Sequence, residues 1–234
     1  MSSIASQLQV VHARINTAAQ AAGRAPQEIT LLAVSKHFDA DCVLQAWHAG
    51  QMAFGENYVQ EAIDKIAAVR AAAPEAGLAW HFIGPIQSNK TRQIAEHFDW
   101  VHSVDREKVA RRLSEQRPAG LPPLNICLQV NISGEASKSG VAPEAALALA
   151  REVAALPRLK LRGLMAIPEP AGDLAAQREP HRALRELLEA MNAEGLELDT
   201  LSIGMSADLE AAIAEGATWV RIGSAIFGSR PAKA

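Results

Sequence analysis

Cysteine, aromatic residues and clustered charge are all scarce in this sequence of 234 residues. The two cysteines, Cys42 and Cys127, have no other residues near them at metal-ligand spacing, so we expect no metal site and two reduced, buried thiols, as in a cytosolic protein. The net charge of −3 comes without a block of basic residues, which excludes the electrostatic footprint of a nucleic-acid-binding protein. No apolar run reaches membrane-spanning length, and residues 1–23 carry polar groups throughout, so we expect no membrane span, no signal peptide and a cytoplasmic location.

What the sequence does contain is an alternation of strand-length apolar runs with helix-length segments. A hydrophobic fraction of 49% over 234 residues suits one α/β barrel better than two separate domains. We therefore predict a single domain over residues 1–234, a (β/α)8 TIM barrel with an additional N-terminal helix that covers its outside. The predicted strands are residues 29–36, 52–55, 79–84, 100–104, 124–132 and 159–167, and two more that begin at Thr200 and Thr218.

Capping and terminating residues set the predicted helix boundaries. The long Pro- and Gly-rich stretch 168–173 is expected to be a functional or mobile loop, because such loops are uncommon in compact domains. The predicted helices start at Ser2 or Ser3, at Asp39, after Tyr58 (ending near Ala72), at Ser88, Asp105, Pro143 and Pro180, and at Ser206, which caps the segment that Gly216 ends.

The fifth predicted strand alternates apolar and polar residues at every step. A barrel strand has no solvent face, so its polar set is expected to point into the lumen. Gln129 and Asn131 are nearest its C-terminal end, so we expect them close to any ligand.

The last two strands are each followed by a turn of small residues, Gly204-Met205-Ser206 and Gly223-Ser224. Backbone N–H groups and a hydroxyl can approach an anion closely at such turns. In an eight-stranded barrel, phosphate groups often bind at the loops after the last two strands. The pair of turns therefore predicts a phosphate site.

Lys36, Arg221, Ser206 and Asn57 all fall at strand ends that meet at the same mouth of the barrel. Burial of Lys36 would favour its neutral amine, which can attack a carbonyl; the alternative is a lysine that extends to solvent from a strand end. Arg221 needs a partner, either a ligand or a carboxylate in a structural ion pair. Ser206 could equally be only a helix cap, and Asn57 only a turn residue.

A lysine, a cation and a phosphate site in one mouth suit a phosphorylated aldehyde as ligand. Pyridoxal 5'-phosphate fits this description, and so does a phosphorylated sugar aldehyde bound as a Schiff base.

The sequence resembles the pyridoxal phosphate homeostasis protein family, a single barrel similar to the N-terminal domain of alanine racemase. The resemblance implies that Lys36 forms the internal aldimine, that Ser206 with Gly223 and Ser224 holds the phosphate, that Arg221 faces the pyridine nitrogen, and that Asn57 lines the pocket. The motifs that carry it are Ala33-Val34-Ser35-Lys36, Phe54-Gly55-Glu56-Asn57-Tyr58, residues 81–90, Gly163-Leu164-Met165, residues 202–208 and residues 220–228.

The resemblance further implies a carrier that holds pyridoxal 5'-phosphate and supplies it to other proteins, with PLP-dependent apo-enzymes as recipients and no established catalysis. Arginine cannot give up its proton, so strong electron withdrawal through the ring nitrogen is not expected. The alternative is a PLP-dependent amino-acid racemase, which would need a second acid–base group; the sequence has one tyrosine, Tyr58. A third hypothesis is a Schiff-base lyase that acts on sugar phosphates. No apolar edge or coiled-coil pattern forces assembly, so we expect a monomer.

Lys138 lies in the loop after the fifth strand, which is rich in Gly and Ser. That loop should border the same mouth, so Lys138 is a candidate to take the cofactor from Lys36 by transimination. The alternative is a surface lysine that only adds positive potential near the phosphate.

Overall fold

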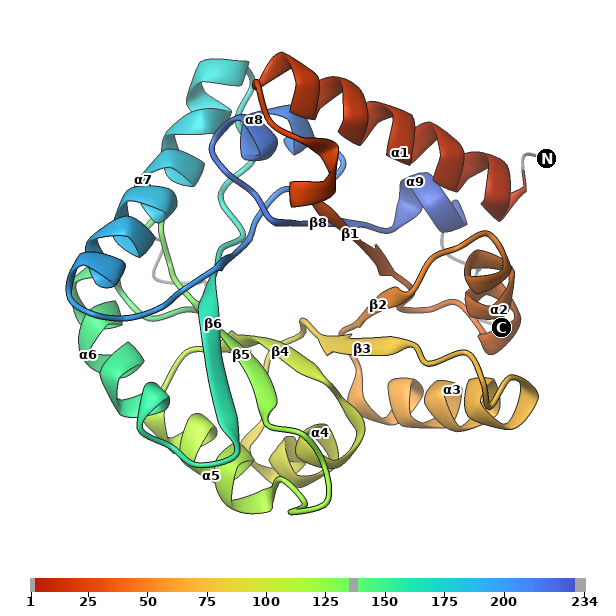
Figure 1. Ribbon diagram of the computed structural model, residues 1–234, viewed down its shortest axis with the longest axis horizontal. Helices are drawn as coiled ribbons and strands as arrows, with labels where there is room; N and C mark the ends of the chain where they lie inside the picture. Colours follow the sequence, from red (N-terminus) through yellow and green to blue (C-terminus); the bar gives the residue numbers. More distant parts are fainter. Residues whose placement is uncertain (1–2, 135–138, 230–234) are drawn as a thin grey trace.

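The computed structural model describes residues 3–134 and 139–229, and its centre is a closed barrel of eight parallel strands, β1 to β8 in sequence order (Figure 1). Pairing of β8 with β1 closes the barrel, with Leu32 opposite Arg221. The predicted TIM barrel is confirmed. The strands are β1 (Thr30–Val34), β2 (Ala53–Glu56), β3 (Ala79–Phe82), β4 (Trp100–Val104), β5 (Leu124–Gln129), β6 (Leu159–Met165), β7 (Thr200–Ser202) and β8 (Trp219–Ile222).

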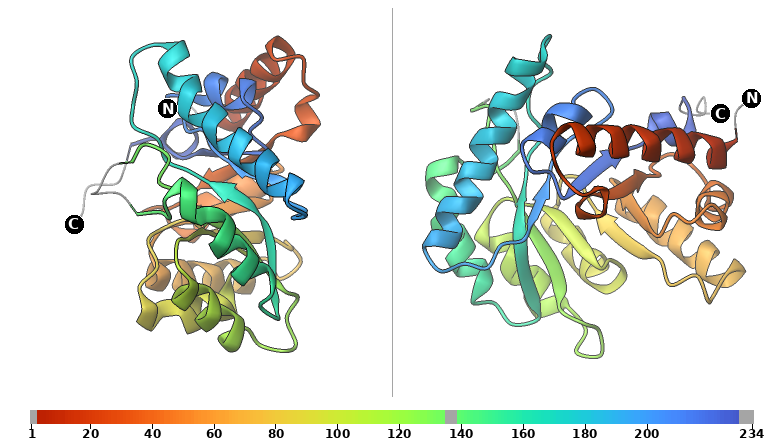
Figure 2. Two further views of the ribbon diagram at one scale, coloured as in Figure 1. Left: turned by 90° about the vertical axis from the view of Figure 1, so that its left-hand side faces the viewer. Right: turned by 45° about the horizontal axis from the view of Figure 1, so that its top comes forward.

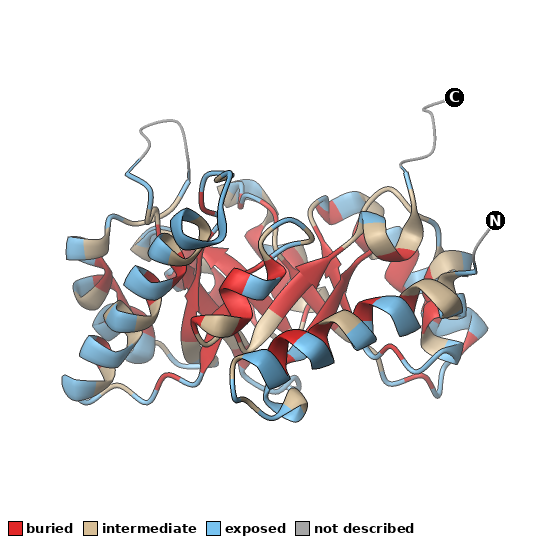
Figure 3. Cartoon of the chain, turned by 90° about the horizontal axis from the view of Figure 1, so that it is seen from above, coloured by how far each residue is buried: buried red, intermediate tan, exposed pale blue. Residues whose placement is uncertain are grey.

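The helices form a ring outside the strands (Figure 1). Most have one buried stripe facing the barrel and an exposed outer face, which Figure 3 shows as red and pale blue sides. They are α1 (Ile4–Ala21), α2 (Ala40–His48), α3 (Val59–Ala72), α4 (Thr91–His97), α5 (Glu107–Gln116), α6 (Pro143–Ala154), α7 (Leu174–Ala193), α8 (Leu209–Ala214) and α9 (Ser224–Phe227), with 3-10 turns η1 (Pro26–Glu28) and η2 (Ser88–Lys90).

The N-terminal helix α1 packs on the outside of the barrel against α2, α8 and α9, as predicted (Figure 2). Ser3 starts it, because the Ser3 hydroxyl accepts a hydrogen bond from the Ser6 amide at 3.2 Å. Leu8, Val11 and Ile15 are buried on its inner face. The helix thus covers the last two units, where α8 has only 6 residues and α9 only 4.

Apolar side chains form two separate layers. The larger layer lies between strands and helices and includes Leu124, Ile126 and Leu128 of β5. The smaller one contains Trp100, Cys127 and Met165, with Trp219 packed against it. Because alternate residues of a strand face opposite sides, this second cluster fills the lumen, as the polarity pattern of β5 predicts. Cys127 is fully buried, whereas Cys42 is only half-buried; both are free thiols.

Several predicted boundaries are wrong; β3 and β6, for example, each end two residues before the predicted positions 84 and 167. α7 begins at Leu174, so Pro180 lies inside it; the Asp173 carboxylate accepts from the Ala176 amide at 2.9 Å and starts the helix two turns earlier. β5 ends at Gln129, and Val130 makes only an isolated bridge to Val141. Strand formation also stops two residues before Lys36, at Val34.

Ser206 does not cap α8, contrary to prediction. The helix begins at Leu209, and the turn before it is organised by Asp208, whose carboxylate accepts a hydrogen bond from the Met205 amide at 2.7 Å. Because the helix begins three residues after Ser206, Asp208 and not Ser206 is its N-cap residue. The Ser206 side chain is therefore available for another role.

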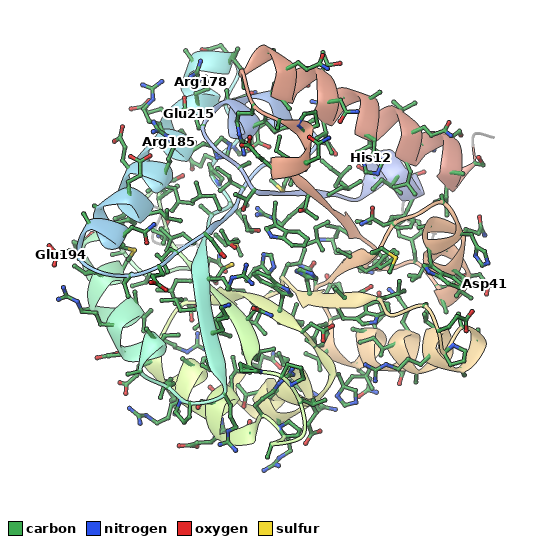
Figure 4. The ribbon with its side chains drawn as sticks, in the orientation of Figure 1. His12, Asp41, Arg178, Arg185, Glu194 and Glu215 are labelled. Carbon is green, nitrogen blue, oxygen red and sulfur yellow. The ribbon has the colours of Figure 1, made fainter. Side chains whose placement is uncertain are left out.

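Charged residues join α7 to the end of α8. Glu215 is buried and accepts hydrogen bonds from Arg178 at 2.7 Å, Arg182 at 3.3 Å and Arg185 at 3.4 Å. Figure 4 shows Arg178 and Arg185 of α7 beside Glu215. These contacts fix the outside of the unit that carries the Gly204–Ser206 turn.

Candidate functional site

A cavity of about 360 Å³ opens among the loops that follow the C-terminal ends of the strands, the end where barrel sites are built. Its volume lies in the range typical of small-molecule sites. The six residues predicted from the sequence, Lys36, Asn57, Ser206, Arg221, Gly223 and Ser224, all line it. The structure thus brings together residues that are up to 188 positions apart, counted from Lys36 to Ser224.

Lys36 lies two residues beyond β1, in a turn whose backbone is held by a residue of α3. The next residue, His37, has a φ of 70°, a strained value for a residue with a side chain. Its amide donates to Glu61 Oε1 at 2.6 Å, which holds the turn in place. The ring of His37 packs against Tyr58, with centroids 5.0 Å apart.

A buried ionic cluster supports the same strand end. Lys65 Nζ donates to Glu56 Oε1 at 2.6 Å and to the Ser35 carbonyl at 2.7 Å, and Ser35 Oγ donates to Glu56 Oε1 at 2.7 Å. Burial raises the pKa of the Glu56 carboxyl, and Lys65 opposes that shift. The cluster ties β1, β2 and α3 together immediately behind Lys36.

Asn57 follows β2 and is half-buried. Its position depends on Gly84, since a Cβ there would lie 2.3 Å from the Asn57 carbonyl oxygen. Within residues 3–134 and 139–229, no hydrogen-bond partner is found for the buried Asn57 Oδ1. An orphaned buried acceptor that lines a cavity is the kind of group a ligand would satisfy.

The turn after β7 is held in place on both sides. Gly204 has a φ of 91°, and a Cβ there would meet the Ala212 Cβ at 2.6 Å. Arg14 of α1 donates to the Ser206 carbonyl at 2.8 Å and binds Glu210 at 2.6 and 2.7 Å. Asp208 also accepts from the Met205 amide and lies 2.9 Å from His181 Nε2.

The turn after β8 leads directly into α9. Gly223 precedes that helix, and a Cβ there would lie 3.1 Å from the Val34 carbonyl oxygen, so there is little room for a side chain. Ser224 is the first residue of α9, where amides have no partner within the helix. Ser224 and Ser206 both line the cavity, so the two turns provide it with hydroxyl and amide donors.

Arg221 points into the barrel, where it is 5% exposed. Its Nη1 donates to the Ser202 carbonyl at 2.5 Å and to Ser202 Oγ at 2.9 Å, and its Nη2 donates to the Ala166 carbonyl at 2.9 Å. Burial lowers the pKa of the guanidinium to about 10, and the distant charge of Asp208 opposes that shift. The structural ion pair that was the alternative reading for Arg221 is thus replaced by hydrogen bonds to neutral acceptors.

A second cavity of about 330 Å³ adjoins the first, and the two share Asn57, Ile83 and Ile167. It is lined by Gln129 and Asn131, the residues predicted to lie near a ligand, and by Ser139. Gln129 Nε2 donates to the Ser139 carbonyl at 3.0 Å. The mouth therefore has an amide-rich side beyond Asn57.

Several lining residues were not predicted from the sequence. Apolar residues at strand ends, such as Val34, Ile83 and Ile167, line the first cavity, and nothing in a run of apolar letters distinguishes them from core residues. Arg14 also gave no signal, because an arginine on the polar face of a helix is ordinarily solvated. His102 and Ser202 lie behind Arg221 and do not line the cavity. Strand alternation could have indicated His102, because it is two residues beyond Trp100 and so shares the lumen-facing side of β4.

Other predictions concern features outside the cavity. Lys138 lies outside the described residues, so its role stays a prediction. In the described part of the chain, no helix is both long enough and apolar enough to cross a membrane. Across the same residues, no group of three or more His, Cys, Asp and Glu side chains could hold a metal ion.

The parallel barrel, the lysine after its first strand and the small-residue turns after its last two define an α/β-barrel protein with a small-molecule site at the C-terminal ends of its strands. The chain belongs to the family described as alanine racemase, N-terminal domain, which matches residues 7–231. The resemblance predicted from the motifs is confirmed.

Two curated relatives are similar over almost the whole chain. The pyridoxal phosphate homeostasis protein of Pseudomonas aeruginosa is 65% identical over 230 residues, 98% of this chain and 97% of that protein. The protein of the same name from Escherichia coli K12 is 54% identical over 98% of each chain.

Solved structures agree with the barrel. PipY of Synechococcus elongatus, in the structure with PLP bound, is 35% identical and superposes with a TM-score of 0.82, covering 96% of this chain and all of its own. Alanine racemase from Corynebacterium glutamicum, at 18% identity and a TM-score of 0.68, shares the fold; this chain covers 62% of it.

Proposed function

We propose that this protein binds pyridoxal 5'-phosphate and serves in its intracellular homeostasis, holding the cofactor covalently through Lys36 and supplying it to other proteins. The observation that carries the proposal is the single cavity lined by Lys36, Arg221 and the turns that contain Ser206 and Ser224. The names of the Pseudomonas and Escherichia relatives, and the PLP bound to PipY, support the same assignment.

The residues present fit such a ligand. When bound, pyridoxal phosphate supplies an aldehyde that a lysine amine can bond to, a phosphate and a ring nitrogen. Ser206, Gly223 and Ser224 would hold the phosphate, and Lys36 would provide the amine. Arg221 would face the ring nitrogen as a fixed hydrogen-bond donor, and the unpartnered Asn57 Oδ1 offers one further polar contact.

We favour a carrier over the racemase alternative. A two-base racemase needs an acid–base group opposite the lysine. Tyr58 is 50% exposed and packs against His37, so its hydroxyl is not enclosed in a site that excludes water. The C. glutamicum racemase chain contains further sequence, since this chain covers only 62% of it. We also propose that residues 1–234 act as one domain and, in solution, as a monomer.

The test is to incubate the protein with pyridoxal 5'-phosphate, reduce with borohydride and map the added mass by peptide mass spectrometry. Modification at Lys36 that is absent in Lys36→Ala supports the proposal. The control is Lys160→Ala, near the N-terminal end of β6, in which the modification at Lys36 should be unchanged. Modification spread over surface lysines contradicts it. A phosphorylated sugar aldehyde that competes equally would favour the lyase reading instead.

Carrier and racemase are separated by a second measurement. The loaded protein is incubated with L- or D-alanine and the products are separated on a chiral column. Racemisation at a rate above that of free pyridoxal 5'-phosphate would contradict the carrier assignment. Transfer of the cofactor to an apo-enzyme, without racemisation, supports it.

A further inference from the structure

Arg221 is the first member of a line of four buried polar side chains that crosses the barrel lumen. Ser202 Oγ accepts from Arg221 and lies 2.7 Å from His102 Nδ1, and His102 Nε2 lies 2.9 Å from His81 Nδ1. His81, His102 and Ser202 are completely buried. The line connects β8, β7, β4 and β3. Figure 4 shows how side chains from the strands fill the space inside their ring.

The hydrogen atoms in this line can be arranged in two ways, because a neutral histidine has one donor and one acceptor nitrogen. In the first, Ser202 donates to His102 Nδ1, and His102 Nε2 donates to His81 Nδ1. Only the His81 Nε2–H then lacks a partner, and that nitrogen is indeed unpaired among the described side chains. In the second, reversed arrangement, the Ser202 hydroxyl proton also loses its acceptor.

Electrostatics favour the first arrangement as well. Arg221 is a buried cation whose three hydrogen bonds all go to neutral oxygen atoms. With the first arrangement, the lone pairs of Ser202 and His102 point toward the guanidinium, so each dipole stabilises its charge. The reversed arrangement would point N–H groups at a buried cation, which costs free energy at a low dielectric constant.

Both histidines are neutral, as the line requires. Burial lowers the pKa of His81 to about 3. Burial also lowers the pKa of His102, with the nearby charge of Arg221 acting in the same direction. The ring of His81 packs on Trp100 at 5.4 Å and Trp219 at 4.7 Å between centroids, which seals the inner end of the line.

We propose that Ser202, His102 and His81 are positioning residues that hold the Arg221 guanidinium in one orientation and balance its charge with aligned dipoles instead of a carboxylate. Since its hydrogen-bond partners among the described residues are all neutral, the guanidinium keeps its full positive charge at the cavity and disfavours protonation of a ring nitrogen placed against it. The consequence for pyridoxal phosphate rests on the proposed function, whereas the orientation of the line does not.

The orientation is tested first on the wild-type protein without cofactor, by ¹⁵N–¹H NMR of the histidine side chains. We expect both His81 and His102 to carry the proton on Nε2, with Nδ1 unprotonated. Protonation of either ring at Nδ1 overturns the proposed arrangement. The same spectra should show slowly exchanging guanidinium protons for Arg221, and these should broaden or vanish in Ser202→Ala.

The effect on ligand binding is tested with Ser202→Ala and Ser202→Thr, and with Ser114→Ala as a matched control. Ser114 is a buried serine of α5 whose hydroxyl donates to the Pro157 carbonyl, far from the lumen. We expect Ser202→Ala to weaken pyridoxal phosphate binding by roughly tenfold, the effect of losing a hydrogen bond to a charged group. The ¹⁵N shift of the ring nitrogen in labelled cofactor should also move, and Ser202→Thr should restore both.

Three outcomes are distinguishable. If Ser202→Ala changes stability as Ser114→Ala does but leaves the ring-nitrogen shift and the affinity unchanged, the line is only structural and the proposal fails. If the wild-type protein binds no pyridoxal phosphate, the proposed function fails, while the histidine and Arg221 spectra of the free protein still decide the positioning role. Loss of the guanidinium signals in Ser202→Ala supports it.

Discussion

Lys36 and the groups that would hold a phosphate follow different strands, so their contributions to binding can be separated. In Lys36→Ala we expect no borohydride-stable product with pyridoxal phosphate but measurable residual binding, because Arg221, Ser206 and Ser224 still line the cavity. Equilibrium dialysis measures the residual affinity. Pyridoxine 5'-phosphate, which lacks the aldehyde, is the matched ligand, and its affinity should be nearly the same in both proteins. Complete loss of pyridoxal phosphate binding would mean that the covalent bond is essential.

Gly204 and Gly195 share a φ of 91°, yet they differ in surroundings. A Cβ at Gly204 would meet the Ala212 Cβ at 2.6 Å, whereas a Cβ at Gly195 would have nothing within 4 Å. Gly195→Ala should therefore lower the free energy of unfolding only by the conformational cost of a positive φ, about 1–2 kcal/mol. Gly204→Ala should lose a further ~1–3 kcal/mol from overpacking and also weaken phosphate binding. Urea denaturation of both variants measures the difference, and equal losses would contradict a role for close packing at this turn.

At the scale of elements, α1 reaches the site through Arg14. The Arg14–Glu210 pair is largely exposed, so breaking it should change the free energy of unfolding by less than about 1 kcal/mol. Its Nη1, however, donates to the Ser206 carbonyl at 2.8 Å and fixes the turn after β7. We expect Arg14→Gln to weaken pyridoxal phosphate binding several-fold with little change in stability.

The control for Arg14→Gln is Arg151→Gln, which breaks the more exposed Arg151–Glu194 pair between α6 and the end of α7. That variant should leave the affinity unchanged. Isothermal titration of both proteins with pyridoxal phosphate provides the comparison. If the two variants bind pyridoxal phosphate with the same affinity, α1 covers the outside of the barrel but does not support the site.

The elements themselves were largely predictable, because their signals are local. The apolar face of α1 and the end of α3 at Ala72 follow from helical spacing, and the strands from apolar runs. Errors arose where one local signal opposed another. Pro180 suggested a helix start, but the Asp173 cap two turns earlier prevailed, and Asp208 rather than Ser206 organises the turn before α8.

The sequence predicted which polar residues line the site, but not which residues hold them in place. Strand ends of a parallel barrel meet by topology, so Lys36 and Arg221 could be assigned to one mouth. Their supports depend on tertiary contacts between residues far apart in sequence, as for Arg14 with Ser206 or Lys65 with Glu56. No period or motif in the sequence reports which polar side chains will be brought together in this way.

At the scale of the whole molecule, β1 pairs with β8, so the first and last strands depend on each other. Loss of either opens the barrel and exposes strand edges. This is why we propose that residues 1–234 unfold as one unit, with coincident fluorescence and circular dichroism transitions in denaturant. A separate early transition in either probe would contradict the single-domain proposal.

The buried histidines also make the stability of the whole barrel depend on pH. Burial depresses the folded-state pKa of His81 to about 3 and lowers that of His102, whereas in the unfolded chain both should titrate near 6.5. Below that value the unfolded chain binds more protons than the folded one, so stability is full above about pH 7 and falls as the pH is lowered. Between pH 7 and pH 5 the lowered pKa of His81 should cost roughly 2 kcal/mol of unfolding free energy, and the lowered pKa of His102 acts in the same direction.

Urea denaturation at pH 7, 6 and 5 measures this dependence. Most carboxylates titrate below that window, and Glu56, whose pKa burial raises, is present in every protein compared, so its contribution cancels. We expect His102→Gln to lower the stability at pH 7, because the lumen line is interrupted, yet to lose less stability than wild type on going to pH 5. The matched control is His48→Gln, at an exposed position of α2. It should follow the wild-type pH dependence. If the unfolding free energy of His102→Gln depends on pH as that of the wild type does, removal of the His102 imidazole has no effect on acid destabilisation. The destabilisation would then arise elsewhere.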